Sequence, residues 1–237
     1  MPEGPEFPPE LYDLARAARI LQMEGHGDVT LGHVSMRDPA GRGLWMKRER
    51  LGLEEVGGRD FVLIDFDGNV IGGQGPRHSE WPIHSEIMLA RPEVNFVGHT
   101  HAFYVVLMSC IAEELRPYTH AGIWLEGPPP RYTETSELIT TRAMGAGIAR
   151  TLGASRTMLI RNHGCAFVGK SIPELCVAGI FLNEACRLHV TLAQMGVKTV
   201  WPDEAEAASK LKMLQRPALL EAYWQYYSRK LARGERS

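Results

Sequence analysis

Residues 94–101 read VNFVGHTH and carry the pattern on which both the fold and the site depend. Apolar residues follow a turn here, so the stretch predicts a buried β-strand that ends in two histidines. Side chains two apart on a strand point the same way, so His99 and His101 are expected to lie side by side. Neutral imidazole is a common ligand of zinc and its neighbouring transition metals. The pair favours a metal site, although two unrelated histidines at a strand end would give the same pattern.

A second apolar stretch, residues 157–161, leads into Asn162-His163-Gly164. The carboxyl ends of strands are where α/β sheets place active sites, and Gly164 permits a sharp turn there. A lone histidine at a strand end is more often structural. Three such histidines in one domain, however, match the three-ligand arrangement with an open position that catalytic zinc sites use.

Glu80 lies just before a helix that is predicted to begin near Pro82. Beside a metal, its carboxylate could serve as a further ligand, as a proton carrier, or as each in turn. The alternative is a glutamate favoured at a helix start by the helix dipole. Position alone favours this second interpretation.

The rest of the chain alternates predicted helices and strands. Strands outnumber simple βαβ units in the first half, which predicts an α/β/α layered fold with a mixed β-sheet. Residues 10–237 are expected to form one domain, preceded by a flexible lead-in at residues 1–9, and the basic tail after residue 230 is expected to be solvated. The predicted helices are residues 10–23, 82–90, 105–111, 134–152, 171–195 and 218–230. The predicted strands are residues 34–37, 43–46, 61–64, 69–71, 94–101, 157–161 and 166–168.

Composition narrows the class of protein. A chain of 237 residues with 44% apolar and 23% charged residues can bury a sizeable core. Its net charge of −2 gives no reason to expect a nucleic acid or an anionic membrane as partner. No signal-peptide pattern and no apolar run approaching about 20 residues is evident, so a cytoplasmic protein is expected. The four cysteines form no CxxC pair and are expected to be buried free thiols: Cys110, Cys165, Cys176 and Cys186.

Four short motifs in a fixed order resemble the class II aldolase/adducin family over residues 10–200. The motifs are GHVSMR (32–37), SEWPIH (79–84), GHTH (98–101) and RNHG (161–164). The resemblance implies a three-layer α/β/α domain with a central mixed sheet. It also implies a small-molecule substrate and a homotetramer with active sites between subunits.

The same resemblance implies roles for individual residues. His99, His101 and His163 match the family's metal ligands. Glu80 matches the catalytic acid/base, which also touches the metal. The implied cofactor is a divalent metal, usually zinc, with manganese or cobalt in some members.

The chain departs from the family's sugar-phosphate enzymes at the three loops that hold phosphate. The first loop usually reads Gly-Thr-x-Gly-Asn-x-Ser, but residues 28–35 read DVTLGHVS, so histidine replaces asparagine. The second usually reads Thr-Pro-Ser-Gly, and residues 45–48 read WMKR; the third usually reads Ser-Ser-Glu, and residues 78–80 read HSE. These exchanges predict a larger cationic pocket that suits a planar carboxylate. The alternative is that the basic residues at positions 47, 48 and 50 form a run of solvated charges. The predicted pocket residues are His33, Lys47, Arg48, His78 and Ser79.

These departures resemble the decarboxylase branch of the family, which acts on hydroxylated aromatic acids of the 3,4-dihydroxyphthalate type. The expected activity is therefore metal-dependent decarboxylation of such an acid. One alternative is an aldolase that cleaves a non-phosphorylated or carboxylated aldol. Another is a metal-free, adducin-like interaction domain, which the presence of all three histidines and Glu80 disfavours.

Overall fold

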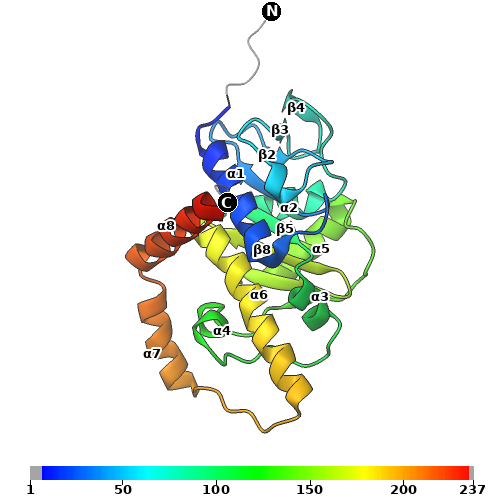
Figure 1. Ribbon diagram of the computed structural model, residues 1–237. Coiled ribbons are helices and arrows are strands. Elements are labelled where there is room, and N and C mark those ends of the chain that lie inside the picture. The colour runs from blue at the N-terminus through cyan, green and yellow to red at the C-terminus, as the bar shows by residue number, and fades with distance from the viewer. Residues whose placement is uncertain (1–6, 235–237) are drawn as a thin grey trace, which may run out of the picture.

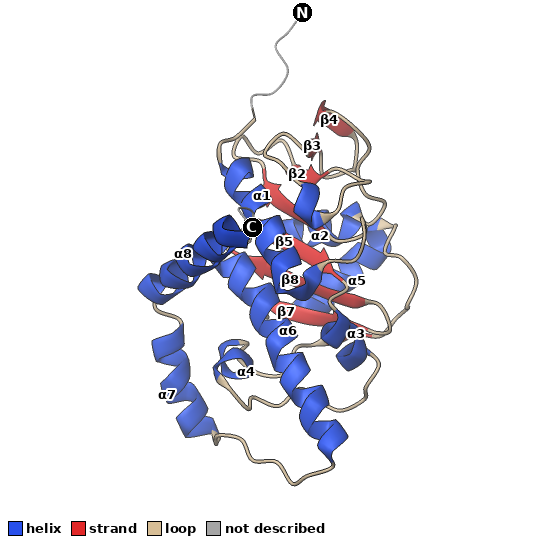
Figure 2. Ribbon diagram, viewed as in Figure 1, coloured by secondary structure: helices blue, strands red, loops and turns tan. Residues whose placement is uncertain are grey.

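One eight-stranded sheet runs through the molecule, with helices on both faces (Figures 1 and 2). The computed structural model describes residues 7–234. The strand order is β4-β3-β2-β1-β5-β8-β7-β6, and every pairing is antiparallel except that of β6 with β7. The prediction of an α/β/α domain with a mixed sheet is confirmed. The strands are β1 (His33–Arg37), β2 (Leu44–Lys47), β3 (Phe61–Ile64), β4 (Val70–Gly73), β5 (Phe96–Thr100), β6 (Arg131–Tyr132), β7 (Thr157–Ile160) and β8 (Gly164–Gly169).

The two faces of the sheet bury separate apolar cores. Trp45 of β2 belongs to the core under α1, α3 and α6, whereas its neighbours Leu44 and Met46 belong to the core under α2 and α5. This alternation is the two-residue period of a strand buried on both faces. The helices are α1 (Glu10–Leu21), α2 (Trp81–Ala90), α3 (Phe103–Ser109), α4 (His120–Trp124), α5 (Arg142–Leu152), α6 (Ile172–Met195), α7 (Glu204–Leu214) and α8 (Pro217–Gly234), with a π-helical turn at Gln22–His26 and a 3-10 turn at Leu53–Glu55.

Helix α6 is the long central helix of one face (Figure 1). Its N-cap is Ser171, whose hydroxyl accepts from the backbone N–H of Glu174. The expectation that no apolar run reaches membrane-spanning length is wrong, because α6 is long and apolar enough to do so. Of its most apolar window, however, 67% is buried against the rest of the protein, so core packing accounts for the composition.

Three other local predictions differ from the structure. The helix predicted from residue 134 begins at Arg142, because the side chain of Thr141 caps it. The preceding residues form a loop, in which Thr135 Oγ1 accepts from the N–H of Glu137, a local bond that competes with helix formation. Helices α4 and α7 were not predicted. Cys110 is exposed at the end of α3, whereas the other three cysteines are buried as expected.

The register of β1 against β5 determines the position of the site. His33 lies directly opposite His99 in this pairing. Ser35 is two residues further along β1, so it lies on the same face, under α2. Gly98 must lack a side chain because a Cβ there would lie 2.4 Å from the ring of Phe167. The end of β5 is therefore tightly packed below and lined with histidines above.

Candidate metal centre

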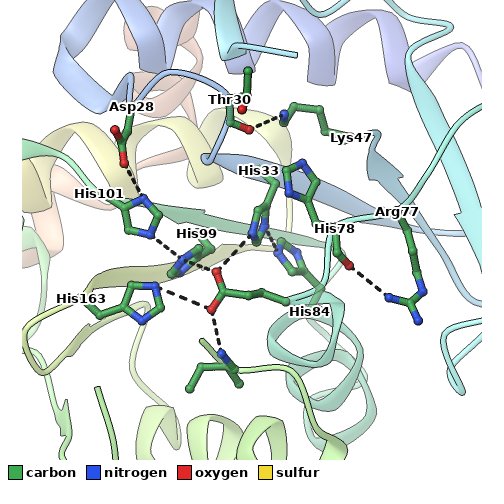
Figure 3. Close-up of polar contacts among 12 residues, drawn as sticks. Asp28, Thr30, His33, Lys47, Arg77, His78, His84, His99, His101 and His163 are labelled. Carbon is green, nitrogen blue, oxygen red and sulfur yellow. Dashed lines mark hydrogen bonds and ion pairs between the residues drawn. The ribbon is translucent and has the colours of Figure 1, made fainter. Parts of the chain in front are cut away.

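Four side chains from three parts of the chain converge at the end of β5 (Figure 3). One ligand atom from each of Glu80, His99, His101 and His163 lies within 4.8 Å of the others. His99 Nε2 is 3.5 Å from Glu80 Oε2 and 3.0 Å from His101 Nε2, and His163 Nε2 is 3.6 Å from Glu80 Oε1. A tetrahedral zinc ion with bonds of about 2.1 Å places its ligand atoms roughly 3.4 Å apart. The three distances are close to that value, so the four groups could surround such an ion.

Each candidate ligand is positioned by a different structural element. His99 is on β5, and His101 is the residue that follows this strand. Glu80 is the residue before α2. His163 lies in the tight turn between β7 and β8. The turn uses Asn162, not Gly164, in the left-handed region, with φ of +55°. Gly164 serves instead to save space, because a Cβ there would lie 2.4 Å from the carbonyl oxygen of Thr100.

Hydrogen bonding prepares the ring nitrogens for a cation. Asp28 Oδ2 accepts from Nδ1 of His101 at 2.9 Å, which leaves the Nε2 lone pair facing the cluster. His163 Nε2 is buried and has no hydrogen-bond partner within residues 7–234. A buried polar atom without a partner is costly, and a metal ion would satisfy it. Both observations fit a divalent metal.

The protonation states also suit a cation. Burial raises the pKa of Glu80, but the charges of His99 and His163 and hydrogen bonds, including one from the N–H of Ile139, outweigh it and bring that pKa to about 2. Burial lowers the pKa of His101 to about 3 and also lowers the pKa of His163. Near neutral pH the site therefore offers the Glu80 carboxylate and the neutral imidazoles of His101 and His163, the forms that bind metals.

A second group of histidines adjoins the cluster. The ring of His33 lies 4.9 Å from that of His99 and 4.4 Å from that of His78, centroid to centroid. His84, on α2, contacts His33 Nδ1 and Ser35 Oγ, both at 2.7 Å. All of these side chains are buried. The sequence predicts His33 and His78 as pocket residues, and the structure adds His84, the last residue of the motif SEWPIH, to this group.

Lys47 of the predicted pocket is fully buried, so it is not part of a solvated charge run. Its ammonium donates to the carbonyl oxygens of Leu51 at 2.5 Å, and of Thr30 and Arg48 at 3.4 Å. No ion pair joins it to a carboxylate in the described part of the chain. Burial lowers the pKa of Lys47 to about 8. Burial, together with the charge of Lys47, lowers the pKa of His78 to about 3.

The two remaining pocket predictions lie in other surroundings. Arg48 donates from Nε to Asp60 Oδ1 at 3.0 Å, and Ser79 is exposed. Of the five predicted residues, the structure therefore brings His33, Lys47 and His78 together beside the metal ligands.

A cleft of about 580 Å³ opens onto the cluster, with His101 and His163 in its lining. Its walls include three apolar side chains that are more than half exposed, Leu31, Phe103 and Leu138. The cleft gives a small molecule access to the metal ligands along an apolar wall. These wall residues were missed by sequence reasoning because isolated exposed apolar residues carry no pattern.

Residues 12–190 match the model described as Class II Aldolase and Adducin N-terminal domain. The chain belongs to this family. It is 28% identical over 195 residues to a 3,4-dihydroxyphthalate decarboxylase from Arthrobacter keyseri, covering 77% of this chain and 78% of the relative. It is 25% identical over 196 residues to a 5-methylthioribulose-1-phosphate/5-deoxyribulose-1-phosphate aldolase from Rhodospirillum rubrum, covering 82% and 87%.

Solved structures of the class II aldolase family share the fold. An L-fuculose 1-phosphate aldolase from Glaciozyma antarctica superposes with a TM-score of 0.81 at 26% identity, covering 95% of this chain and 90% of the other. Together with the buried cluster of three histidines and Glu80, family membership makes this chain a metal-dependent lyase of the class II aldolase superfamily. The adducin-like alternative loses support because the ligand set is complete.

Proposed function

We propose that this lyase is a decarboxylase of a hydroxylated aromatic carboxylic acid of the 3,4-dihydroxyphthalate type. The observation that carries the proposal is the fully buried ammonium of Lys47, whose hydrogen bonds within residues 7–234 go to backbone carbonyls. Burial lowers the pKa of Lys47 despite the opposing charges of Glu55 and Glu54, neither of which forms an ion pair with it. A buried cation without a direct counter-charge is costly. A substrate carboxylate would supply that counter-charge.

His78 and His33 complete the proposed carboxylate site. His78 Nε2 is buried and has no hydrogen-bond partner among the described residues. Its ring packs against His33, which in turn lies beside the metal ligand His99. A substrate with a carboxylate near Lys47 and hydroxyl oxygens near the cluster spans these groups. Arg48, already paired with Asp60, and the exposed Ser79 are left out of this site.

A metal held by Glu80 and the three histidines would act as a Lewis acid that stabilises negative charge on a substrate oxygen. Glu80 is the proposed proton carrier: it takes the proton of a phenolic hydroxyl and delivers it to the ring carbon that bears the carboxylate. The resulting tautomer resembles a β-keto acid, so the carbon–carbon bond breaks, carbon dioxide leaves and the electron pair returns to the oxygen. The phenolate then takes a proton from water.

Three further properties are part of the proposal. The resident metal is zinc, with manganese or cobalt as substitutes, because nitrogen-rich sites of this kind suit all three. The protein forms a homotetramer with active sites between subunits, and it works in the cytoplasm. Membership of the class II aldolase/adducin family supports these three proposals.

An aldolase reaction is the second candidate. It is supported by the similarity to the two phosphate-sugar aldolases. Retro-aldol cleavage and decarboxylation both leave a carbanion that the same metal and Glu80 could serve. The substrate would then be a carboxylated or non-phosphorylated aldol, because bulky residues replace the small donors of the phosphate loops.

The test is carbon dioxide release from 3,4-dihydroxyphthalate by wild type, Lys47→Met and a matched surface variant, Lys198→Met. Lys47→Met is expected to raise KM at least tenfold with unchanged metal content, because a charge-assisted contact of about 1.5 kcal/mol or more is lost. Lys198 is exposed, so its variant should behave as wild type. Absence of carbon dioxide from metal-loaded wild type would overturn the proposal in favour of the aldolase reaction.

A further inference from the structure

Behind the metal ligands lies a short chain of buried hydrogen bonds. His84 on α2 uses both ring nitrogens: Nδ1 lies 2.7 Å from Ser35 Oγ, and Nε2 lies 2.7 Å from Nδ1 of His33. The free nitrogen of His33, Nε2, lies 4.0 Å from Glu80 Oε2 (Figure 3). The series of contacts therefore leads from the Ser35 hydroxyl on β1 to His84 on α2, and then through His33 on β1 to the Glu80 carboxylate.

Burial fixes the charge of the two rings. His33 and His84 are both buried, which favours neutral imidazoles that carry one proton each. The bond between the two rings can hold only one proton. Two directions of donation are therefore possible. In one of them Nε2 of His33 carries the proton that faces Glu80, and in the other Nε2 presents a lone pair.

The surroundings select one direction. If Ser35 donates to His84 and His84 donates to His33, then the remaining N–H of His33 is on Nε2 and faces the Glu80 carboxylate. In the reverse direction a lone pair of His33 would face that carboxylate and repel it. The hydroxyl proton of Ser35 would also lose its acceptor, because Ser35 Oγ has no other partner in the described part of the chain.

We infer that His84, together with Ser35, is a positioning residue that fixes His33 as the Nε2–H tautomer and directs this N–H at Glu80. The role rests on the proposed function, in which Glu80 carries the proton. The N–H dipole attracts Oε2 and so fixes the orientation of the Glu80 carboxylate beside the cluster. The device is a property of this chain's own residues, since it requires histidine at position 33.

Three variants separate positioning from simple filling of space. In His84→Gln the side-chain amide can still donate to His33 and accept from Ser35, whereas His84→Leu fills similar space without either bond. Ser35→Ala removes only the hydroxyl that starts the chain. The exposed His120 supplies a control, His120→Leu, that changes the same residue type elsewhere.

The decisive readout is the tautomer itself, from 15N NMR of the Zn²⁺-loaded protein labelled at histidine, with His33 assigned by its loss in His33→Asn. Wild type, His120→Leu and His84→Gln are expected to show protonated Nε2 on His33. His84→Leu and Ser35→Ala are expected to show a mixture of tautomers. A pure Nδ1–H form in wild type, or unchanged tautomers in both disrupted variants, would overturn the inference.

Kinetics with 3,4-dihydroxyphthalate give a second readout. His84→Leu is expected to lower kcat roughly 10–100-fold, the usual effect of losing a group that orients a site residue, with little change in KM or zinc content. His84→Gln should recover most of the loss; a His84→Leu variant with full kcat would contradict the role. If wild type does not turn over this substrate, the proposed function fails, while the NMR result still decides the inference.

Discussion

Removing the carboxylate of Asp28 should weaken the metal site without touching a ligand. Asp28 Oδ2 accepts from His101 Nδ1 at 2.9 Å and so holds the ring with Nε2 toward the cluster. A hydrogen bond to a charged group contributes about 1.5–3 kcal/mol. The Asp28 side chain is 36% exposed, which places the effect at the lower end. Asp28→Ala is therefore expected to cost about 1.5 kcal/mol of zinc binding, roughly a tenfold rise in Kd.

Competition with a chelator of known affinity measures this change. Asp28→Asn keeps an acceptor for the ring N–H but loses the charge, so its Kd should fall between those of wild type and Asp28→Ala. Asp67→Asn is the matched control, because this carboxylate is 72% exposed and pairs with Arg142 away from the cluster. Zinc affinity in Asp28→Ala equal to that of wild type would refute the idea that Asp28 orients His101.

Three further predictions follow from the site and its surroundings. Glu80→Gln should retain zinc through the three histidines but lose most turnover, and wild-type rates would remove Glu80 from the reaction. Burial lowers the pKa of His26 to about 4, below the usual 6.5, so between these pH values the unfolded chain binds more protons and stability falls as pH falls. His26→Gln should therefore reduce the loss of unfolding free energy between pH 7 and pH 5 by about 2 kcal/mol in urea titrations, and an unchanged loss would contradict this. Leu138→Asp, at the exposed wall of the cleft, should raise KM for an aromatic substrate with zinc content unchanged, and an unaltered KM would remove Leu138 from the access path.

The clustering of the three histidines could be predicted from the sequence because its signals are local. The alternation of a strand places His99 beside His101, and the motif around His163 follows an apolar strand in the same way. Glu80 was ambiguous from position alone, because a helix start explains a glutamate equally well. The family resemblance favours the catalytic interpretation, and the short distances between the Glu80 carboxylate and the histidines support it.

The surroundings of the ligands could not be predicted, because they depend on contacts between distant segments. Asp28 and His101 are 73 residues apart in the chain, and Ser35 and His84 are 49 apart. The charge of Lys47 was correctly noted, but whether carbonyls, a carboxylate or water surround it depends on how two loops fold over β2. The helix predicted from residue 134 is wrong for a related reason: side-chain hydrogen bonds of Thr135 and Thr141 compete with helix formation there, and the resulting loop presents the Ile139 N–H to Glu80.

X-ray absorption at the zinc K-edge of the Zn²⁺-loaded protein tests the metal centre most directly. The site predicts three imidazole nitrogens and one or more oxygens at about 2.0–2.2 Å, with one zinc per chain. The imidazole signal should decrease in His163→Ala, which leaves the other ligands in place. A spectrum of oxygen or sulfur scatterers without imidazole, or one unchanged in that variant, would contradict the account.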